Sequence, residues 1–176
     1  SIGKGRIIKN GDGKLSVNGI TNNCSIVVSN GVCAVSNSEV LEAEVVVNER
    51  VSNRRIEFSN TRITGALKYV NDPDCCVPFI CGAKNEATTN IIEGPISGRG
   101  HCRISAGSKG GSKLYIKGGF AGGNYLIVSG VGTNVSEVII EDTPISGNIN
   151  KLYNDSNNAT LVFRTQGNYF KDPLHQ

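Results

Sequence analysis

The stretch that decides the fold is Ile139-Ile140-Glu141-Asp142-Thr143-Pro144-Ile145-Ser146-Gly147. It joins a β-branched pair to a carboxylate, then a spacer, then isoleucine, a hydroxyl residue and glycine. The phrase also occurs as Ile91-Ile92-Glu93-Gly94-Pro95-Ile96-Ser97-Gly98 and, with a longer spacer, at residues 56–65. A short strand, a corner and another short strand that recur along a chain are typical of stacked β architectures, in which each unit buries its apolar face against the next. The phrase therefore predicts a repetitive all-β scaffold.

The spacing between the copies indicates the length of the repeating unit. The closing glycines of the second and third copies, Gly98 and Gly147, are separated by close to two coils of about 24 residues each. The interval from Gly65 to Gly98 is shorter and falls between one coil and two, so it needs an irregular coil or loop. The Cys-containing stretch at residues 71–90 loses the alternation of strands, and we expect one loop excursion there. Some eight coils, stacked about 4.8 Å apart, would form a rod about 40 Å long.

Two all-β folds are consistent with the short β-branched runs, which begin at Leu114, Leu126 and Val138. A right-handed parallel β-helix of short stacked coils turns corners between its strands, whereas an antiparallel β-sandwich or jelly roll uses hairpins. The Asn-Gly pairs at residues 10–11, 18–19 and 30–31 would suit type I′ hairpin turns. The phrase spacing favours the coil, and the direction of strand pairing distinguishes the two folds.

Helical patterns are almost missing from the sequence. Residues 40–51 are the best candidate, but their apolar positions give no clean helical face, and the triplet Val45-Val46-Val47 favours a strand. The composition has 20 Asn and 22 Gly, which suits many tight turns because both residues accept positive φ. We therefore expect residues 1–176 to form a single β-rich domain.

The charge and hydropathy of the sequence argue against two kinds of partner, nucleic acid and the membrane interior. The formal charge of +3 comes with scattered basic residues and no interleaved aromatic stripe, so we expect no nucleic-acid partner. No apolar run approaches the roughly 18 residues of a membrane helix, and we expect no membrane insertion. The chain begins with Ser1 rather than Met, so we expect a fragment or a processed product.

The six cysteines leave two interpretations open. They are Cys24, Cys33, Cys75, Cys76, Cys81 and Cys102. Mostly free, buried thiols that act as small hydrophobic residues are favoured, and one or two disulfides are the alternative. With no Cys-x-x-Cys pair, the spacing around His101 matches no closed zinc site, and the glycine-rich residues 107–123 are better interpreted as corner turns than as a phosphate loop. We expect no metal and no cofactor.

A few carboxylates and tyrosines are candidate site residues. Glycoside cleavage needs two carboxyl groups about 5–9.5 Å apart. Glu93 and Glu141 occupy equivalent places in the phrase, which makes them, with Asp142, weak catalytic candidates. The favoured interpretation is that these glutamates face solvent between core isoleucines. The candidate ligand-binding residues are Asp72, Asp74, Tyr115, Tyr125 and Tyr153, and Asp72-Pro73-Asp74 is interpreted as an acidic turn in preference to a calcium site.

Three stretches resemble a known group of folds. Residues 22–30 (Asn-Asn-Cys-Ser-Ile-Val-Val-Ser-Asn), 135–142 (Val-Ser-Glu-Val-Ile-Ile-Glu-Asp) and 145–153 (Ile-Ser-Gly-Asn-Ile-Asn-Lys-Leu-Tyr) are similar to coils of the right-handed parallel β-helices of bacteriophage tailspikes and pectate-lyase-like proteins. The resemblance is one of pattern and includes no catalytic motif. Among tailspikes it implies a trimeric virion protein that contacts carbohydrate.

Three functions are consistent with these features of the sequence. The first is a non-catalytic structural or receptor-binding module of a virion tailspike or surface adhesin, a homo-oligomer that contacts cell-surface glycan. The second is a polysaccharide-degrading enzyme that uses Glu93 and Glu141. The third is a processed viral or filament subunit with a β-sandwich fold, since Ser1 and Gln176 suit a product of a protease that cuts between Gln and Ser. The expected location is the virion or the cell surface.

Overall fold

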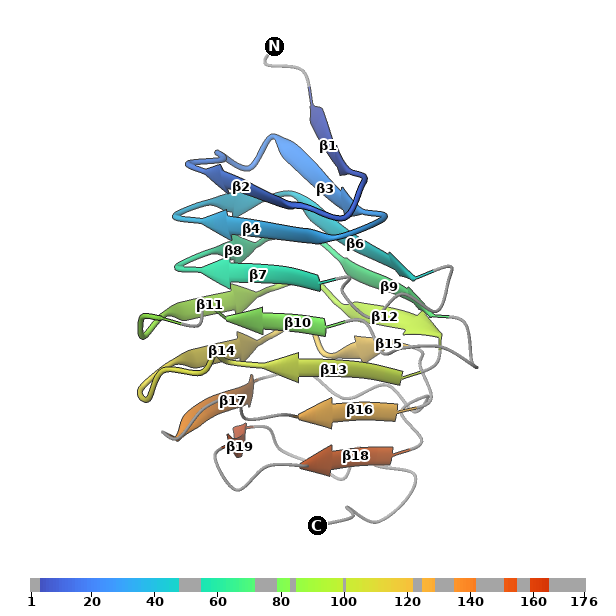
Figure 1. The fold of residues 1–176 in the computed structure, drawn as a ribbon. Helices are drawn as coiled ribbons and strands as arrows, with labels where there is room; N and C mark the ends of the chain where they lie inside the picture. Colours follow the sequence, from blue (N-terminus) through green and yellow to red (C-terminus); the bar gives the residue numbers. More distant parts are fainter. Residues whose placement is uncertain are drawn as a thin grey trace.

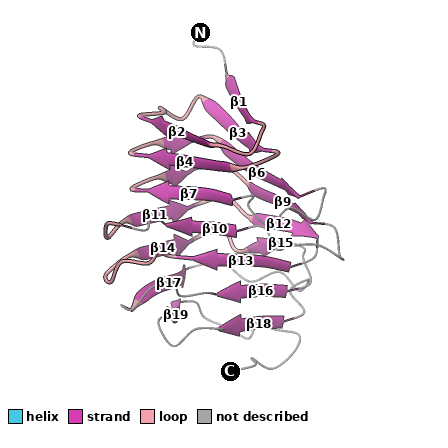
Figure 2. Cartoon of the chain, viewed as in Figure 1, coloured by secondary structure: helices cyan, strands magenta, loops and turns pink. Residues whose placement is uncertain are grey.

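The structure, a computed structural model, is built from parallel β-strands (Figure 1). It describes residues 4–47, 55–71, 79–82, 85–99, 101–121, 125–128, 135–141, 151–154 and 159–164. Within these ranges every regular element is a strand, and no helix occurs (Figure 2). All pairings between the described strands are parallel, as in a parallel β-helix. The all-β prediction is confirmed, and the antiparallel sandwich is wrong.

The strands form three sheets, which we call A, B and C. Sheet A consists of β1 (Gly5–Lys9), β3 (Cys24–Val28), β6 (Glu42–Val47), β9 (Leu67–Asn71), β12 (Ile96–Arg99) and β15 (Phe120–Ala121). Sheet B consists of β2 (Lys14–Asn18), β4 (Val32–Ser36), β7 (Arg55–Ser59), β10 (Phe79–Gly82), β13 (His101–Ser105), β16 (Tyr125–Val128) and β18 (Lys151–Asn154). Sheet C consists of β5 (Glu39–Val40), β8 (Arg62–Ile63), β11 (Thr89–Ile92), β14 (Lys113–Ile116), β17 (Ser136–Glu141) and β19 (Ala159–Arg164).

The chain passes from sheet A to sheet B to sheet C in each full coil. In Figure 1 the strands of sheet B run leftward across the front and those of sheet C return behind them as the chain descends, so the coil is right-handed. Tyr115 pairs with Ile91 on one side and with Ile139 on the other, so one coil takes about 24 residues in each direction. This confirms the predicted coil length for these coils, whereas the first coils are shorter, since Lys14 pairs with Val32, 18 residues further on (32 − 14). Sheet B has seven strands among the described residues, one fewer than the eight coils expected.

The first copy of the repeated phrase does not align with the other two. Glu57 lies in sheet B, whereas Glu93 and Glu141 follow equivalent isoleucines in sheet C. The residue that stacks on Ile92 is Ile63, which stands near the end of the first copy and not beside its carboxylate. Gly98 stacks on Tyr69, so Gly65 and Gly98 are not equivalent positions in successive coils. A two-residue side-chain period is the same in every sheet, and it therefore cannot tell which sheet a strand joins.

The excursion at residues 71–90 stays a prediction, and the structure shows a change in corner length at residues that flank and overlap it. Few residues separate Arg55 in sheet B from Arg62 in sheet C. The equivalent positions one coil later, Phe79 and Ile91, are separated by more residues, so the corner between the two sheets is longer there. The next coil has the same long corner, because Arg103 and Tyr115 are separated by as many residues as Phe79 and Ile91. The corner between sheets B and C is thus longer in these later coils than in the earlier ones. Residues 72–78 and 83–84 of the predicted loop lie outside the described residues.

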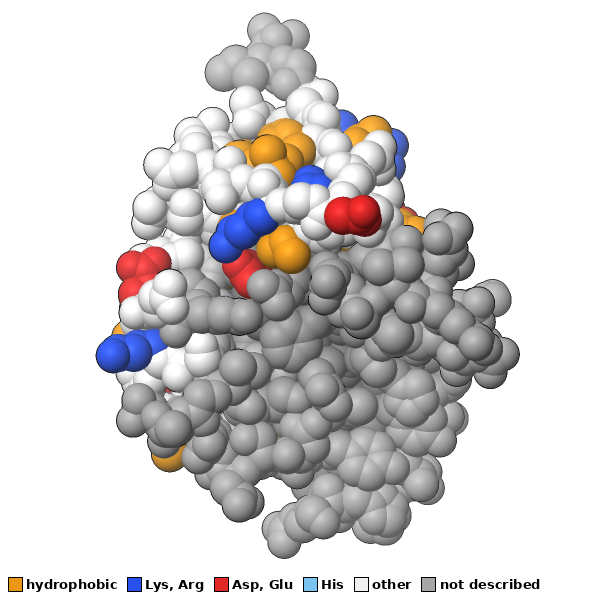
Figure 3. Space-filling model, in the orientation of Figure 1, with side chains coloured by type: hydrophobic (Ala, Val, Ile, Leu, Met, Phe, Trp, Pro, Cys, Tyr) orange, Lys and Arg blue, Asp and Glu red, His pale blue; other side chains and the backbone are white. Residues whose placement is uncertain are grey.

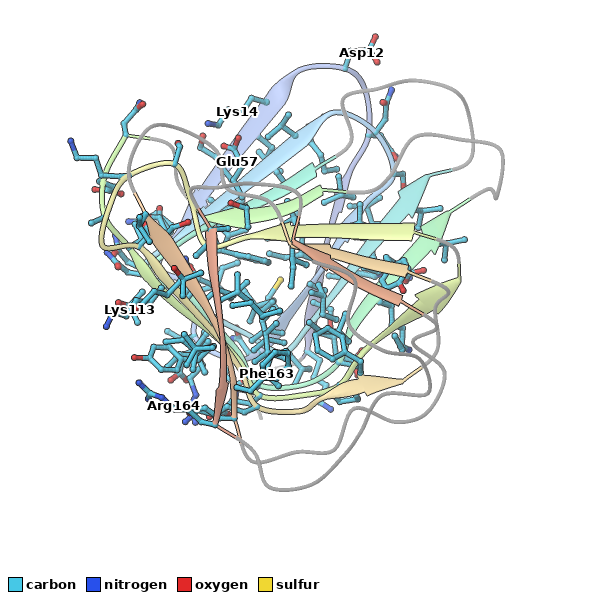
Figure 4. The ribbon with its side chains drawn as sticks, turned by 90° about the horizontal axis from the view of Figure 1, so that it is seen from below. Asp12, Lys14, Glu57, Lys113, Phe163 and Arg164 are labelled. Atoms are coloured by element: carbon cyan, nitrogen blue, oxygen red, sulfur yellow. The ribbon has the colours of Figure 1, made fainter. Side chains whose placement is uncertain are left out.

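The core is made of like side chains stacked between coils. Sheet C contributes Val40, Ile63, Ile92, Ile116 and Ile140, all at most 1% exposed and all in one register column. Full burial of one such side chain contributes about 1.5–3 kcal/mol. At the C-terminal end Phe163 continues the column and points inward, whereas Arg164 points outward (Figure 4).

The Asn-Gly pairs are corners of the coil and not hairpin turns. Only the glycine of each pair has positive φ, at Gly11, Gly19 and Gly31, whereas a type I′ turn requires positive φ at both residues. One coil below Gly19, and again in the coil after that, the equivalent corner positions are occupied by Asn37 and Asn60, with φ of 46° and 49°. Asn and Gly are the residues that adopt this conformation most readily, so the Asn-rich composition follows from the corners.

A second column of small residues lies at the corner between sheets C and A. A methyl group added to Gly94 would overlap the carbonyl of Gly65, and one added to Gly118 would overlap the carbonyl of Gly94. Backbone from successive coils therefore meets there without room for a side chain.

We expect Gly94→Ala to lower the free energy of unfolding by about 2 kcal/mol or more, because backbone must move to admit the methyl group. Gly13→Ala is the matched control, since nothing lies within 4 Å of the added atom and φ is not positive. It should change stability by at most about 0.5 kcal/mol. Urea unfolding measures both values, and equal losses in the two variants would contradict the stacking of these corners.

Two cysteines are described with their side chains, and both are free thiols. Cys24 is half-buried and Cys33 is fully buried. Burial raises the pKa of the Cys33 thiol from 9.0 to about 11, and the positive charge of Lys9 opposes this in part. The interpretation as buried free thiols is thus confirmed for Cys33. The side chains of the other four cysteines lie outside the described set.

The raised pKa of Cys33 predicts a pH dependence of stability. Because the unfolded chain loses the thiol proton first, the contribution is complete below pH 9 and is lost as pH rises toward 11. We expect Cys33→Ala to show a shallower fall in the urea midpoint than the natural chain between about pH 8.5 and pH 10.5. Parallel falls in the two proteins would show that the folded chain does not hold this proton more tightly.

Candidate functional site

The two candidate glutamates lie in one column at the edge of sheet C, with Lys117 at the position between them. Two strand spacings separate Glu93 from Glu141, or about 9.6 Å along the coil axis. The phrase therefore placed them correctly on one face. Asp142, the third catalytic candidate, lies outside the described residues, as do Asp72 and Asp74.

Both glutamates belong to ion pairs that link neighbouring coils. Glu141 lies 3.1 Å from Arg164 and 3.8 Å from Lys117. Glu93 lies 2.9 Å from Arg62, which also contacts Glu39 at 3.2 Å. The hydrogen bond to Glu93, together with its charge, raises the pKa of Arg62 above its usual value. Each carboxylate is thus balanced by a cation, and the arrangement supports a structural role.

The candidate tyrosines do not form one site. Tyr115 is half-buried on the outer face of sheet C, where it follows Ile91 in the same column. Tyr125 and Tyr153 lie on adjacent strands of sheet B, two residues out of register with each other. The side chains of the latter two are outside the described set.

A shallow groove of about 580 Å³ lies above Tyr115, on the outer side of sheet C and its corner with sheet B. It crosses four successive coils and is lined by Ile20, Thr21, Asn37, Ser38, Glu39, Asn60, Thr61, Arg62, Thr89 and Ile91. None of these positions was proposed as a site residue from the sequence. The signal available in the sequence was the residue type at Asn37 and Asn60, since asparagine is one of the residues that accept the positive φ found there.

The groove exists because the corner between sheets B and C becomes longer partway down the coil. In Figure 1 the loops that follow β10 and β13 extend further to the left than those after β4 and β7. The first long loop is tied to the coil above, since Ser59 donates to Glu86 Oε1 at 2.6 Å and the Thr89 amide donates to Asn60 Oδ1 at 3.2 Å. The loop thus forms a ledge under the short corners.

Buried hydroxyl and amide groups hold the wall of the groove in place. Ser38 donates to Ser36 O at 2.6 Å, and Thr61 donates to Val35 O at 3.1 Å. The buried Asn90 side chain accepts from the Thr61 amide at 3.0 Å and so joins two coils. These bonds satisfy corner backbone that would otherwise be buried without partners.

The exposed lining of the groove is polar at its rim and apolar at two points. Side chains of Thr21, Asn37, Asn60, Arg62 and Thr89 are exposed. Ile20 and Ile91 provide half-buried aliphatic surface. Within the described ranges no group of three or more His, Cys, Asp or Glu side chains is placed to hold a metal ion. The groove therefore offers hydrogen bonds and apolar contact.

Comparison of the chain with protein-family models, with curated proteins and with solved structures finds no match. In the part of the chain that the structure describes, no helix is long and apolar enough to cross a membrane.

We expect Glu141→Gln to lower the free energy of unfolding by less than about 1 kcal/mol, because exposed ion pairs contribute little. The loss should exceed that of Glu137→Gln, since Glu137 has one ion-pair partner among the described residues, Lys113 at 3.3 Å, and Glu141 has two. Urea unfolding in low and high salt measures this difference, which should shrink as salt screens the charges. A loss that is unaffected by salt would contradict the electrostatic explanation.

Proposed function

We propose that the chain is a non-catalytic binding rod that contacts glycan on a cell surface, as a receptor-binding module of a virion tailspike or an adhesin. The observation that carries this proposal is the stepped groove, which runs along the coil axis on the outer side of sheet C. The proposal also draws on the resemblance of the sequence to tailspike coils.

The length and chemistry of the groove suit an oligosaccharide. Four coils span three strand spacings, about 14 Å, which is enough for a few sugar units in line. Amide, hydroxyl and guanidinium groups from Asn37, Thr21 and Arg62 offer both donors and acceptors. Ile20 and Ile91 offer apolar surface to the C–H faces of sugar rings, and Tyr115 continues that surface beyond the ledge.

The ion pairs of Glu93 and Glu141 favour binding without cleavage. Glycoside cleavage uses one carboxyl group as an acid and the other as a base or nucleophile. In this structure cations hold both Glu93 and Glu141, and Lys117 occupies the position between them. A place on the virion or cell surface, in a homo-oligomer, follows as part of the proposal.

The test is a screen of the purified chain on an array of bacterial capsular, O-antigen and animal-cell oligosaccharides, followed by titration of the hits. Arg62→Gln should weaken binding about tenfold or more, because a hydrogen bond from a charged donor contributes about 1.5–3 kcal/mol. Arg164→Gln is the matched control, since it removes a similarly exposed arginine from a glutamate pair on the same sheet but outside the groove. It should change affinity less than twofold.

Two outcomes would overturn the proposal. One is the absence of binding to every glycan on the array. The other is an equal loss of affinity in both arginine variants, which would place the contact elsewhere. Release of shorter sugars from a bound glycan, abolished by Glu141→Gln, would favour the enzyme in place of the binding module.

A further inference from the structure

The outer face of sheet A, near the N-terminal end of the coil, has features that the groove does not share. A hollow of about 340 Å³ crosses its first strands. It is lined by Lys4, Gly5, Arg6, Ser25, Ile26, Val27, Glu42, Ala43, Glu44 and Lys68. Half of these residues carry a charge.

The charges on this face form no ion pair within the described part of the chain. On sheet C, by contrast, each charged residue of the column through Glu141 has a partner, as do Arg62 and Lys113. Lys4, Arg6, Glu42, Glu44 and Lys68 are all placed with their side chains, and none lies within 4 Å of an opposite charge there. A face built from the same kind of strands thus leaves both signs of charge available to a partner.

The same face exposes aliphatic side chains. The exposed large hydrophobic residues among those described are Ile8, Val70 and Val135, at 53%, 42% and 54%. Two of the three, Ile8 and Val70, belong to β1 and β9 of sheet A. Exposed aliphatic groups are enriched at protein interfaces, and complementary charges there fix the register of the partners. The front face also shows hydrophobic side chains next to charged ones in its upper, described part (Figure 3).

The order of the charges along the coil axis is self-complementary. Arg6 pairs in register with Ser25, and Ser25 with Glu42, so a positive coil, a neutral coil and a negative coil follow one another. Lys4 adds to the positive coil and Glu44 to the negative coil, and the coil after that carries Lys68, in register with Glu44. A two-fold rotation about an axis that runs along β3 places the positive coil of one copy on the negative coil of the other.

We propose that two copies of this chain pack sheet A against sheet A, with their coil axes antiparallel, around a two-fold axis that runs along β3 between the sheets. Arg6 of each copy then faces Glu42 of the other, because β1 and β6 each lie one strand spacing from the axis. Lys4 and Glu44 lie on opposite sides of this pair along the strands and do not face each other. Ile8 of each copy then faces Glu44 of the other, since both residues are in register with Val27, so the charge pairing of Arg6 with Glu42 is the contact that stabilises the dimer.

The two-fold arrangement sets the size of the assembly. Each copy uses the same patch, so the interface closes on itself and gives a dimer rather than a filament. Two such sheets can pack about 10 Å apart, the usual distance between facing sheets. A trimer, which the tailspike resemblance implies, would instead require two different patches to meet.

The test measures the mass of the purified chain in solution by light scattering and sedimentation over a range of concentrations. We expect twice the chain mass of 18.6 kDa. The double variant Glu42→Lys, Glu44→Lys should be monomeric, because like charges then face each other in the dimer. The double variant Lys4→Glu, Arg6→Glu should be monomeric for the same reason. An equimolar mixture of the two variants should restore the dimer, since each variant complements the other.

Control variants separate loss of association from loss of folding. Thr160→Lys adds a charge on the exposed outer side of sheet C and should remain dimeric. All variants should keep the far-ultraviolet circular dichroism of the natural chain. A monomer at every concentration, a trimer, or a mixture of variants that stays monomeric would each overturn the proposal. None of these outcomes depends on whether the chain binds glycan.

Discussion

The structure depends on one constraint, the in-register stacking of parallel strands from each coil to the next. Backbone hydrogen bonds place each residue directly over its equivalent in the next coil, so an inward position must suit its neighbours above and below. Ile92, Ile116 and Ile140 satisfy this requirement with identical side chains. Where backbones meet at a corner, Gly65, Gly94 and Gly118 satisfy it by having no side chain.

The same constraint makes corner length the main way in which this coil can vary its surface. Strands cannot shift without breaking register, whereas a corner can lengthen without disturbing the sheets. Between Arg55 and Phe79 the corner from sheet B to sheet C changes from short to long, and the later coils that the structure describes keep the change. The resulting ledge, tied by the bond from Ser59 to Glu86, produces the groove.

Stacking also brings surface charges of successive coils together on sheets B and C. On sheet C, acidic and basic residues alternate down the columns, and the Lys14–Glu57 pair of 2.9 Å spans two coils on sheet B (Figure 4). On sheet A a neutral coil separates Arg6 from Glu42, and the two side chains form no ion pair within one molecule. The three faces are thus built alike but differ in what they leave for a partner.

The sequence by itself determined the all-β class, the period of the later coils and the equivalence of Glu93 with Glu141, and it favoured the parallel coil over the sandwich. Those features follow from local chemistry that repeats, such as isoleucine pairs, corner asparagines and glycines. It did not determine that Glu57 belongs to a different sheet, that the corner change persists, or that Thr21, Arg62 and Ile91 share a groove. Only the tertiary structure decided these points, because alternation along a strand is the same in every sheet, and pairing register brings residues from successive coils into contact.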